Sequence, residues 1–394
     1  MVSRRTLLAS GALLGGAAFY SYKRGIRYPR LSLEPRPLNE EHHLPRALAS
    51  FKDIIVTGAS DFRAIAPEPK IILNARRGTI KFTVSNIAPN AKLSITGKGI
   101  KRLDEQAKGL SRVIILDSAI EQTIILNWQL DVKDGFEFAV MGDTGGGSEL
   151  AWTLKRAHEL GAQFLLHLGD FNYTDGEYAS AIKLFNSSPL PCYVTIGNHD
   201  FHDNGLIYQQ FLNEIGPMNH SFELAGTRFV NIDTAADFFP AQGGLRGDLF
   251  NRLTPHPGEQ VFFTHRPLKD PRPHDDHNVG GINEVSWLAQ EINRLGGQYY
   301  LHGHVHHSAE LDYQGIRQIC AGEGLGYENL VHQKQVAQIM MAKVEPNTRM
   351  MHYWRDLNLP WLDHQNPTHA MKLKRDGRLQ QLDWHTDLLK SKRT

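Results

Sequence analysis

The chain has 394 residues, of which 41% are apolar and 22% charged, an ordinary composition for a globular protein. Its 43 Lys and Arg nearly balance its 42 Asp and Glu, which argues against the strongly basic surface of a nucleic-acid-binding protein. The length suffices for one large domain and a smaller one.

Residues 1–27 are expected to be an export signal. Arg4 and Arg5 precede an apolar run from Leu7 to about Tyr20, which is too short for a comfortable membrane span. The stretch "SRRTLL" resembles the twin-arginine export signal of bacteria. We therefore expect export to the periplasm by the twin-arginine machinery. No clear Ala-x-Ala cleavage site follows, so two outcomes stay open, cleavage or retention as an inner-membrane anchor. A disordered basic start is the alternative interpretation.

Two further patterns precede the main part of the chain. Residues 28–50 are rich in proline and charge, which predicts a linker. Residues 51–132 carry short β-type runs divided by turns rich in Gly, Asn, Pro and Lys, which predicts a small all-β domain. The runs are "DIIVTG", "TIKFTVSN", "KLSITG", "RVIILD" and "QTIILNWQL". This region holds no cluster of metal-ligand residue types, so its sequence indicates no activity of its own.

Residues 133–355 alternate between strand-type and helix-type runs. The runs "FEFAVMGD", "QFLLHLGD", "CYVTIGNHD", "RFVNID", "VFFTHRP" and "QYYLHGHVH" predict strands. The stretch "SELAWTLKRAHELG" predicts a helix with Ser148 as N-cap and Gly161 as its end, and "AIKLF", "GLIYQQFLNEIG" and "NEVSWLAQEINRLG" predict three more. The alternation is typical of a layered α/β domain. The polar residues 356–394 are expected to form a C-terminal tail.

The two cysteines, Cys192 and Cys320, lie in the short apolar runs "PCYVTI" and "RQICAG". This placement predicts two buried free thiols. In an exported protein a disulfide is the alternative, and the sequence does not show whether the two residues lie within bonding range.

Several strands of the α/β region are followed by side chains that bind metals. They deliver, in chain order, Asp143, Asp170 with Tyr173, Asn198 with His199, His265, and His304 with His306. Each of these signals is weak when taken singly. Because open α/β sheets place their sites at the carboxyl ends of the strands, we expect the five groups to converge. Residues two apart in an extended segment point the same way, which directs the last two histidines to one spot.

The motifs "GDTG", "GD", "GNHD", "FFTH" and "GHVH", across residues 142–306, resemble the ordered motif set of the calcineurin-like metallophosphoesterases. The resemblance covers about half the chain. It implies an α/β fold, a layered αββα metallophosphoesterase sandwich, here preceded by the small all-β domain. Where the wider family has His, this chain has Gly145, and "GDFNY" supplies a tyrosine instead. The purple acid phosphatase branch has the same exchange, which implies that Tyr173 is a phenolate ligand.

The same resemblance implies two metal ions that share one carboxylate. The first site is expected to hold Fe(III), because a phenol ionises at neutral pH only against a strong Lewis acid. Its ligands would be Asp143, Asp170, Tyr173 and His306. The second site has a neutral amide and two imidazoles and suits divalent Zn, Mn or Fe. Its ligands would be Asp170, Asn198, His265 and His304.

The expected activity is hydrolysis of a small phosphate ester, acid phosphatase-like, in which a hydroxide held by the metals attacks phosphorus. His199 is expected to act as general acid or as a donor to the phosphoryl group, with a structural role as the alternative. His274 or His277, in the loop "RPHDDHNVGG", is a further candidate for protonating the leaving group. Three other interpretations stay open: a phosphodiesterase of the same fold, an iron-dependent reaction with peroxides, and a binding module without activity.

Overall fold

The structure is a computed structural model, which describes residues 47–51, 54–58, 61–201, 207–235, 242, 244–272, 276–325, 337–346 and 348–358. The predicted signal or anchor at 1–27 and all but the first residues of the predicted tail at 356–394 lie outside this part of the chain. Residues 47–50 of the predicted linker belong to the first strand, β1 (Ala47–Phe51). Among the helices of the described residues, none has the length and apolar character needed to cross a membrane.

The first part of the structure is a β-sandwich, as the sequence predicts. One sheet has the strand order β1-β4-β9-β6 and the other β2-β3-β5-β8-β7. The strands after β1 are β2 (Ile54–Gly58), β3 (Asp61–Ala64), β4 (Lys70–Ala75), β5 (Gly78–Ser85), β6 (Lys92–Thr96), β7 (Ile100–Lys108), β8 (Ser111–Ser118) and β9 (Gln122–Gln129). Alternate residues point inward, as in β9, where Ile124, Leu126 and Trp128 are buried. They form a core of their own between the two sheets.

The second part contains two larger sheets. The first has the order β12-β11-β10-β19-β20 and the second β13-β14-β15-β16-β18-β17. The first is built from β10 (Phe136–Met141), β11 (Phe164–His167), β12 (Cys192–Val194), β19 (Gln338–Val344) and β20 (Met351–Asp356). The second is built from β13 (His220–Leu224), β14 (Thr227–Asn231), β15 (Gln260–Phe263), β16 (Tyr299–His302), β17 (Ser308–Tyr313) and β18 (Ile316–Ala321).

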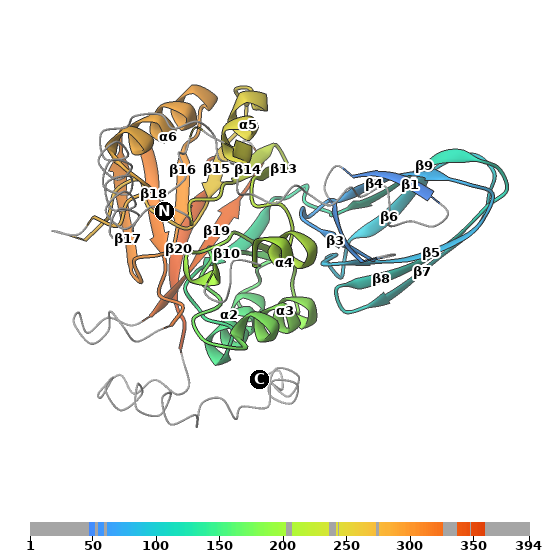
Figure 1. Ribbon diagram of the computed structural model, residues 1–394, viewed down its shortest axis with the longest axis horizontal. Helices are drawn as coiled ribbons and strands as arrows, with labels where there is room; N and C mark the ends of the chain where they lie inside the picture. The colour runs from blue at the N-terminus through green and yellow to red at the C-terminus, as the bar shows by residue number, and fades with distance from the viewer. Residues whose placement is uncertain are drawn as a thin grey trace, which may run out of the picture.

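Helices cover the outer face of each sheet (Figure 1). They are α2 (Ser148–Glu159), α3 (Glu177–Ser187) and α4 (Ile207–Glu214) on the first sheet, and α5 (Gly244–Arg252) and α6 (Ile282–Leu295) on the second. A short 3₁₀ helix, η2 (His199–Phe201), follows β12.

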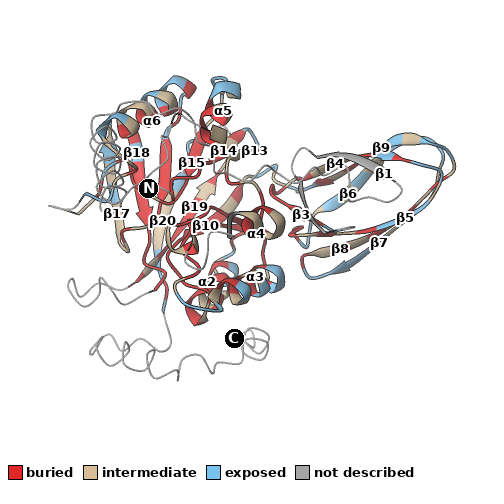
Figure 2. Ribbon diagram, viewed as in Figure 1, coloured by how far each residue is buried: buried red, intermediate tan, exposed pale blue. Residues whose placement is uncertain are grey.

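Strand alternation explains the four layers. In β10, Phe138 and Val140 pack between the two sheets, whereas Ala139 and Met141 face the helices of the first layer. In β15, Phe263 lies between the sheets and Phe262 packs against α6. The central strands are therefore buried on both faces, as Figure 2 shows. The αββα sandwich and the preceding all-β region are as expected.

The ends of α2 and the two cysteines can also be compared with the predictions from the sequence. The expectation that Ser148 is an N-cap is wrong, because Gly147 takes that position and Ser148 is the first residue of α2. Gly161 follows the end of α2 with a φ of 89°, the left-handed conformation that favours glycine after a helix. Cys192 and Cys320 are both buried free thiols, as predicted.

The β-sandwich is joined to the first layer by buried polar contacts. The side-chain amide of Asn86 accepts a hydrogen bond from the backbone N–H of Cys192 at 2.9 Å and donates to the Cys192 carbonyl at 3.0 Å. It also donates to the carbonyl of Ala64 at 2.8 Å. The buried Arg63 donates to Asn186 at the end of α3, at 2.6 Å. These contacts connect the sandwich to the start of β12 and to the end of α3.

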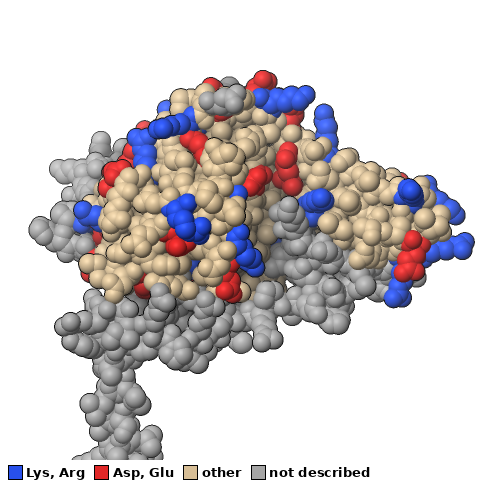
Figure 3. Space-filling model, turned by 90° about the horizontal axis from the view of Figure 1, so that it is seen from above, with Lys and Arg blue, Asp and Glu red and all other residues tan. Residues whose placement is uncertain are grey.

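The surface charge agrees with the near-neutral composition. On the face drawn in Figure 3, Lys and Arg side chains are interspersed with Asp and Glu over the αββα part, and several basic side chains stand at the far end of the β-sandwich. Lys98, Lys101 and Arg102 are among the exposed basic residues of the sandwich.

Candidate metal centre

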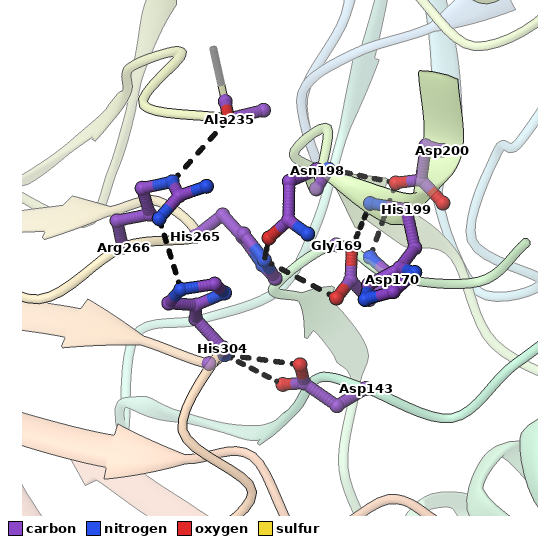
Figure 4. Close-up of polar contacts among 12 residues, drawn as sticks. Asp143, Gly169, Asp170, Asn198, His199, Asp200, Ala235, His265, Arg266 and His304 are labelled. Carbon is purple, nitrogen blue, oxygen red and sulfur yellow. Dashed lines mark hydrogen bonds and ion pairs between the residues drawn. The ribbon is translucent and has the colours of Figure 1, made fainter. Parts of the chain in front are cut away.

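The structure brings all seven predicted ligands to one place, at the carboxyl ends of strands from both large sheets. Asp143, Asp170 and Asn198 follow β10, β11 and β12 of the first sheet. His265 follows β15 of the second sheet, and His304 and His306 follow β16. Figure 4 shows side chains from the two sheets pointing toward one another.

One group is formed by Asp143, Asp170 and His306, whose ligand atoms lie within 4.8 Å of one another. The Nε2 atom of His306 lies 3.4 Å from Oδ1 of Asp143. The hydroxyl of Tyr173 joins this group, at 3.1 Å from Nε2 of His306 and 3.4 Å from Oδ2 of Asp170. The ring of Tyr173 also reaches Gly145, where a Cβ atom would lie 3.5 Å from Cδ2 of the tyrosine.

A second group is formed by Asp170, His265 and His304, again with ligand atoms within 4.8 Å. Nε2 of His265 lies 3.3 Å from Oδ2 of Asp170 and 2.9 Å from Oδ1 of Asn198. Nδ1 of His265 donates to the carbonyl of Leu168 at 2.8 Å, so Nε2 is the nitrogen directed at the group. Asp170 belongs to both groups.

Backbone strain is concentrated at this site. Four of the eight non-glycine residues with positive φ in the described part of the chain are predicted ligands. Their φ values are 59° for Asp143, 58° for Asp170, 70° for His304 and 43° for His306. Such conformations cost energy and persist where the surrounding structure holds them, as at functional sites.

Glycines allow the backbone to approach the two carboxylates. A side chain at Gly303 would collide with Oδ2 of Asp143, and one at Gly197 would collide with Oδ1 of Asp170. The backbone N–H of His304 donates to both oxygens of Asp143, at 3.0 and 2.9 Å. The N–H of His199 donates to Oδ1 of Asp170 at 2.8 Å.

Burial and neighbouring charges act against each other in these groups. Burial raises the pKa of Asp143, against the opposing effect of His306. Burial acts in the same direction on Asp170, but the charge and hydrogen bond of His265 outweigh it and lower the pKa of Asp170 to about 2. Burial opposes protonation of His265, yet Asp170 outweighs it and raises the pKa of that imidazole. Asp170 and His265 therefore each favour the charged form of the other, beside a second buried acid.

Asp200, directly after His199, is a supporting residue that sequence reasoning missed. Its buried carboxylate accepts hydrogen bonds from the N–H groups of Gly197 at 2.7 Å, Phe171 at 2.8 Å and Asp170 at 3.1 Å. It joins the loop after β11 to the loop after β12. Its place within "GNHD" was the available signal, but the sequence does not show which N–H groups it reaches.

Two further supports hold the loops around Asp143 and Tyr173. The carboxylate of Glu177, at the start of α3, accepts from the N–H of Tyr173 at 2.7 Å and of Thr174 at 3.1 Å. His167 is fully buried, its Nε2 lies 2.9 Å from the hydroxyl of Thr144, and burial lowers the pKa of His167 to about 3. The neutral imidazole thus supports the turn after Asp143.

Of the three predicted proton donors, His199 and His277 lie in the described part of the chain. The imidazole of His199 lies against the ring of Tyr173, with centroids 4.5 Å apart, and burial lowers its pKa. His277 lies beside the second group, with its ring 5.3 Å from that of His304. His274 lies outside the described residues.

The donor set fits two cations. Two buried carboxylates, one phenol, one amide and three imidazoles converge in two groups, and cations would compensate the buried negative charge that burial otherwise disfavours. The oxygen-rich group with the phenol suits a harder cation, and the group with two imidazoles suits a divalent transition metal.

Comparisons with known proteins agree with this arrangement at the level of family. Residues 136–308 match the family model of the calcineurin-like phosphoesterases, which indicates a metal-dependent phosphoester hydrolase. The match does not distinguish the purple acid phosphatase branch. No curated protein matches the chain.

Solved structures similar to the chain include GAP50, the anchor in the inner membrane complex of Plasmodium, at 15% identity over 61% of this chain and 95% of that one, with a TM-score of 0.43. A dimetal phosphatase from Danio rerio aligns at 14% identity over 56% of this chain and 96% of that one, with a TM-score of 0.40. An archaeal phosphodiesterase aligns at 15% identity over 56% and 99%, with a TM-score of 0.33. At these TM-scores the alignments carry no conclusion about the function of the chain.

Proposed function

We propose that the protein is a dinuclear metal-dependent hydrolase of small phosphate esters, of the acid phosphatase-like kind. The observation that carries the proposal is the position of Tyr173. Its hydroxyl lies 3.1 Å from Nε2 of His306 and 3.4 Å from Oδ2 of Asp170, beside a glycine at position 145. A Cβ atom at position 145 would lie in ordinary contact with the ring, 3.5 Å from its Cδ2 atom, so positions 145 and 173 lie side by side at the first group.

Each ligand has a defined role in this proposal. Fe(III) would be held by Asp143, Asp170, Tyr173 and His306. A divalent Zn, Mn or Fe ion would be held by Asp170, Asn198, His265 and His304. When bound, the two ions would activate water and neutralise the charge of the phosphoryl group. Asp170, which belongs to both groups and whose Oδ1 accepts from the N–H of His199, would be the ligand that the two sites share.

His199 is proposed to hold the proton that the leaving group takes up. Its backbone is fixed by Asp170 and its ring by contact with Tyr173, so the imidazole stays at the edge of the metal centre. His274, outside the described residues, is retained as a second donor in this proposal, and His277 of the same loop reaches His304.

The N-terminus and the domain divisions complete the proposal. Residues 1–27 direct export through the twin-arginine machinery to the periplasm, where the enzyme is free or held by this segment at the inner membrane. A linker follows and ends before β1, which starts at Ala47. After it come the β domain up to residue 132, the catalytic domain at 133–355 and the tail at 356–394. Replacing Arg4 and Arg5 by Lys should retain the protein in the cytoplasm, and unchanged export of that variant would contradict the assignment.

The test of the proposed function is a visible spectrum together with metal analysis. The wild type should contain two metals, show a phenolate-to-iron charge-transfer band and turn over a chromogenic phosphomonoester. Tyr173→Phe removes the donor oxygen and keeps the ring, so the band should vanish while the fold survives. An iron-containing wild type without colour, or a Phe variant with the band intact, would contradict the phenolate ligand. Turnover of peroxide in place of phosphate esters would favour the redox alternative.

A further inference from the structure

Arg266 stands at the edge of the metal centre, directly after His265. Its Nη1 lies 3.0 Å from Nε2 of His304, and its Nε lies 3.3 Å from the carbonyl of Ala235. Figure 4 shows the guanidinium between these two partners. The motifs that identify the metal ligands do not include this residue.

The backbone of Arg266 is held firmly on both sides. Its N–H donates to the hydroxyl of Thr234 at 2.8 Å, and its carbonyl accepts from the hydroxyl of Tyr300 at 2.8 Å. Thr234 and Tyr300 are both fully buried. The half-buried guanidinium is therefore carried by a fixed piece of backbone at the edge of the metal centre.

The contact with His304 does not survive metal binding. A guanidinium has only donors, so Nε2 of His304 accepts the hydrogen bond through its lone pair. If a metal takes Nε2, that lone pair is no longer available. If a metal takes Nδ1, the proton of the neutral imidazole resides on Nε2, and two donors then face each other. In either case the hydrogen bond between Nη1 of Arg266 and His304 is lost, and Nη1 can donate to another acceptor at the edge of the centre.

We infer that Nη1 of Arg266, once it no longer donates to His304, binds the phosphoryl oxygen that a phosphate monoester has and a diester lacks, and so selects monoesters. The inference rests on the proposed function. A guanidinium presents donors that match phosphate oxygens, and such charge-assisted hydrogen bonds are among the stronger ones. In a diester an ester group replaces one of the three free oxygens, and the substrate carries one negative charge fewer.

The test compares the metal-loaded wild type with Arg266→Gln and with Lys269→Gln. Lys269 is exposed three residues along the chain, so its substitution removes the same charge without touching the centre. Arg266→Gln should lower kcat/KM for p-nitrophenyl phosphate about 10- to 100-fold, the range expected for a hydrogen bond to a charged group. The value for bis-p-nitrophenyl phosphate should change less than about threefold. Lys269→Gln should leave both values unchanged.

Two binding measurements separate this role from a structural one. Inorganic phosphate should bind the metal-loaded Arg266→Gln protein about tenfold or more weakly in calorimetry. After its metals are removed with a chelator, Arg266→Gln should rebind metal as tightly as the wild type or more tightly. The reason is that the guanidinium, which contacts His304 and carries a positive charge near the site, is gone. Arg266→Lys should keep part of the phosphate affinity.

An equal loss for both esters, or weaker metal binding by Arg266→Gln and Arg266→Lys, would assign Arg266 a structural role and overturn the inference. Unchanged phosphate affinity in metal-loaded Arg266→Gln would also overturn it. Failure of the proposed function would look different, since the wild type itself would then bind no metals or hydrolyse neither ester.

Discussion

Replacing Asn86 tests whether the β-sandwich and the αββα part unfold as one unit. The Asn86 amide makes three buried hydrogen bonds, two to the backbone of Cys192 and one to the carbonyl of Ala64. Asn86→Ala removes all three and leaves the Cys192 N–H without this partner. At about 1 kcal/mol for each bond, the loss is about 3 kcal/mol.

The backbone of Asn86 adds a further cost. Its φ is 62°, a left-handed conformation that asparagine adopts more readily than alanine, so the substitution costs about 1 kcal/mol more. Asn86→Ala should therefore lower the free energy of unfolding by about 4 kcal/mol. Asn86→Gly loses the same bonds but relieves the φ penalty, so it should lose about 1 kcal/mol less than the alanine variant.

The assay is urea unfolding followed by tryptophan fluorescence. Trp128 reports on the β-sandwich, and Trp152 and Trp287 report on the αββα part. Asn90→Ala, four residues along and exposed, is the control and should stay within about 0.5 kcal/mol of wild type. The reasoning would be refuted if Asn86→Ala lowered the free energy of unfolding by less than about 1 kcal/mol. It would also be refuted if the glycine variant were less stable than the alanine variant.

Three further predictions concern the metal centre and pH. Asp170→Asn should lose most bound metal and nearly all activity, and a variant that keeps two metals per chain would show that Asp170 is not the bridge. Gly146→Ala should abolish metal binding, because its Cβ would collide with the carbonyl of Glu177. The Cβ of Gly147→Ala would meet only a flexible side chain, so this control should keep both metals. Equal metal contents in the two variants would contradict the prediction. Burial lowers the pKa of His220 to about 4, so the unfolded state binds more protons below pH ~6.5 and stability falls with acidification. When the pH falls from 7.5 to 5.5, the free energy of unfolding measured in urea should decrease by about 1 kcal/mol less in His220→Gln than in the wild type. Equal decreases in the two proteins would refute the contribution of His220.

The elements and the ligand types were readable from the sequence because both are local properties. Buried strands such as "FLLHL" carry an apolar pattern that sets their type, and the residue after each strand carries the chemistry. The exchange between Gly145 and Tyr173 was visible in the same way, since each lies in a short motif. Where prediction failed, as with Ser148, the difference is one residue at a helix end, where no side-chain cap is formed.

Tertiary structure alone decided which residues surround these ligands. Asn86 and Cys192 are 106 residues apart, and the N–H of His304 reaches Asp143 across 161 residues. Such contacts depend on how two sheets with separate strand orders pack face to face. No local pattern encodes that packing.

The sequence by itself therefore determined the kinds of layer and the chemistry of the donors, because strand periodicity and side-chain type need no partner to be read. Only the tertiary structure decided that the carboxyl ends of both sheets meet, and that Asp200 joins two ligand loops. It also decided that Arg266 lies against His304, 38 residues away in the chain. The physical reason is that hydrogen bonds across a core are selected by the global packing of apolar faces, which sums over the whole chain.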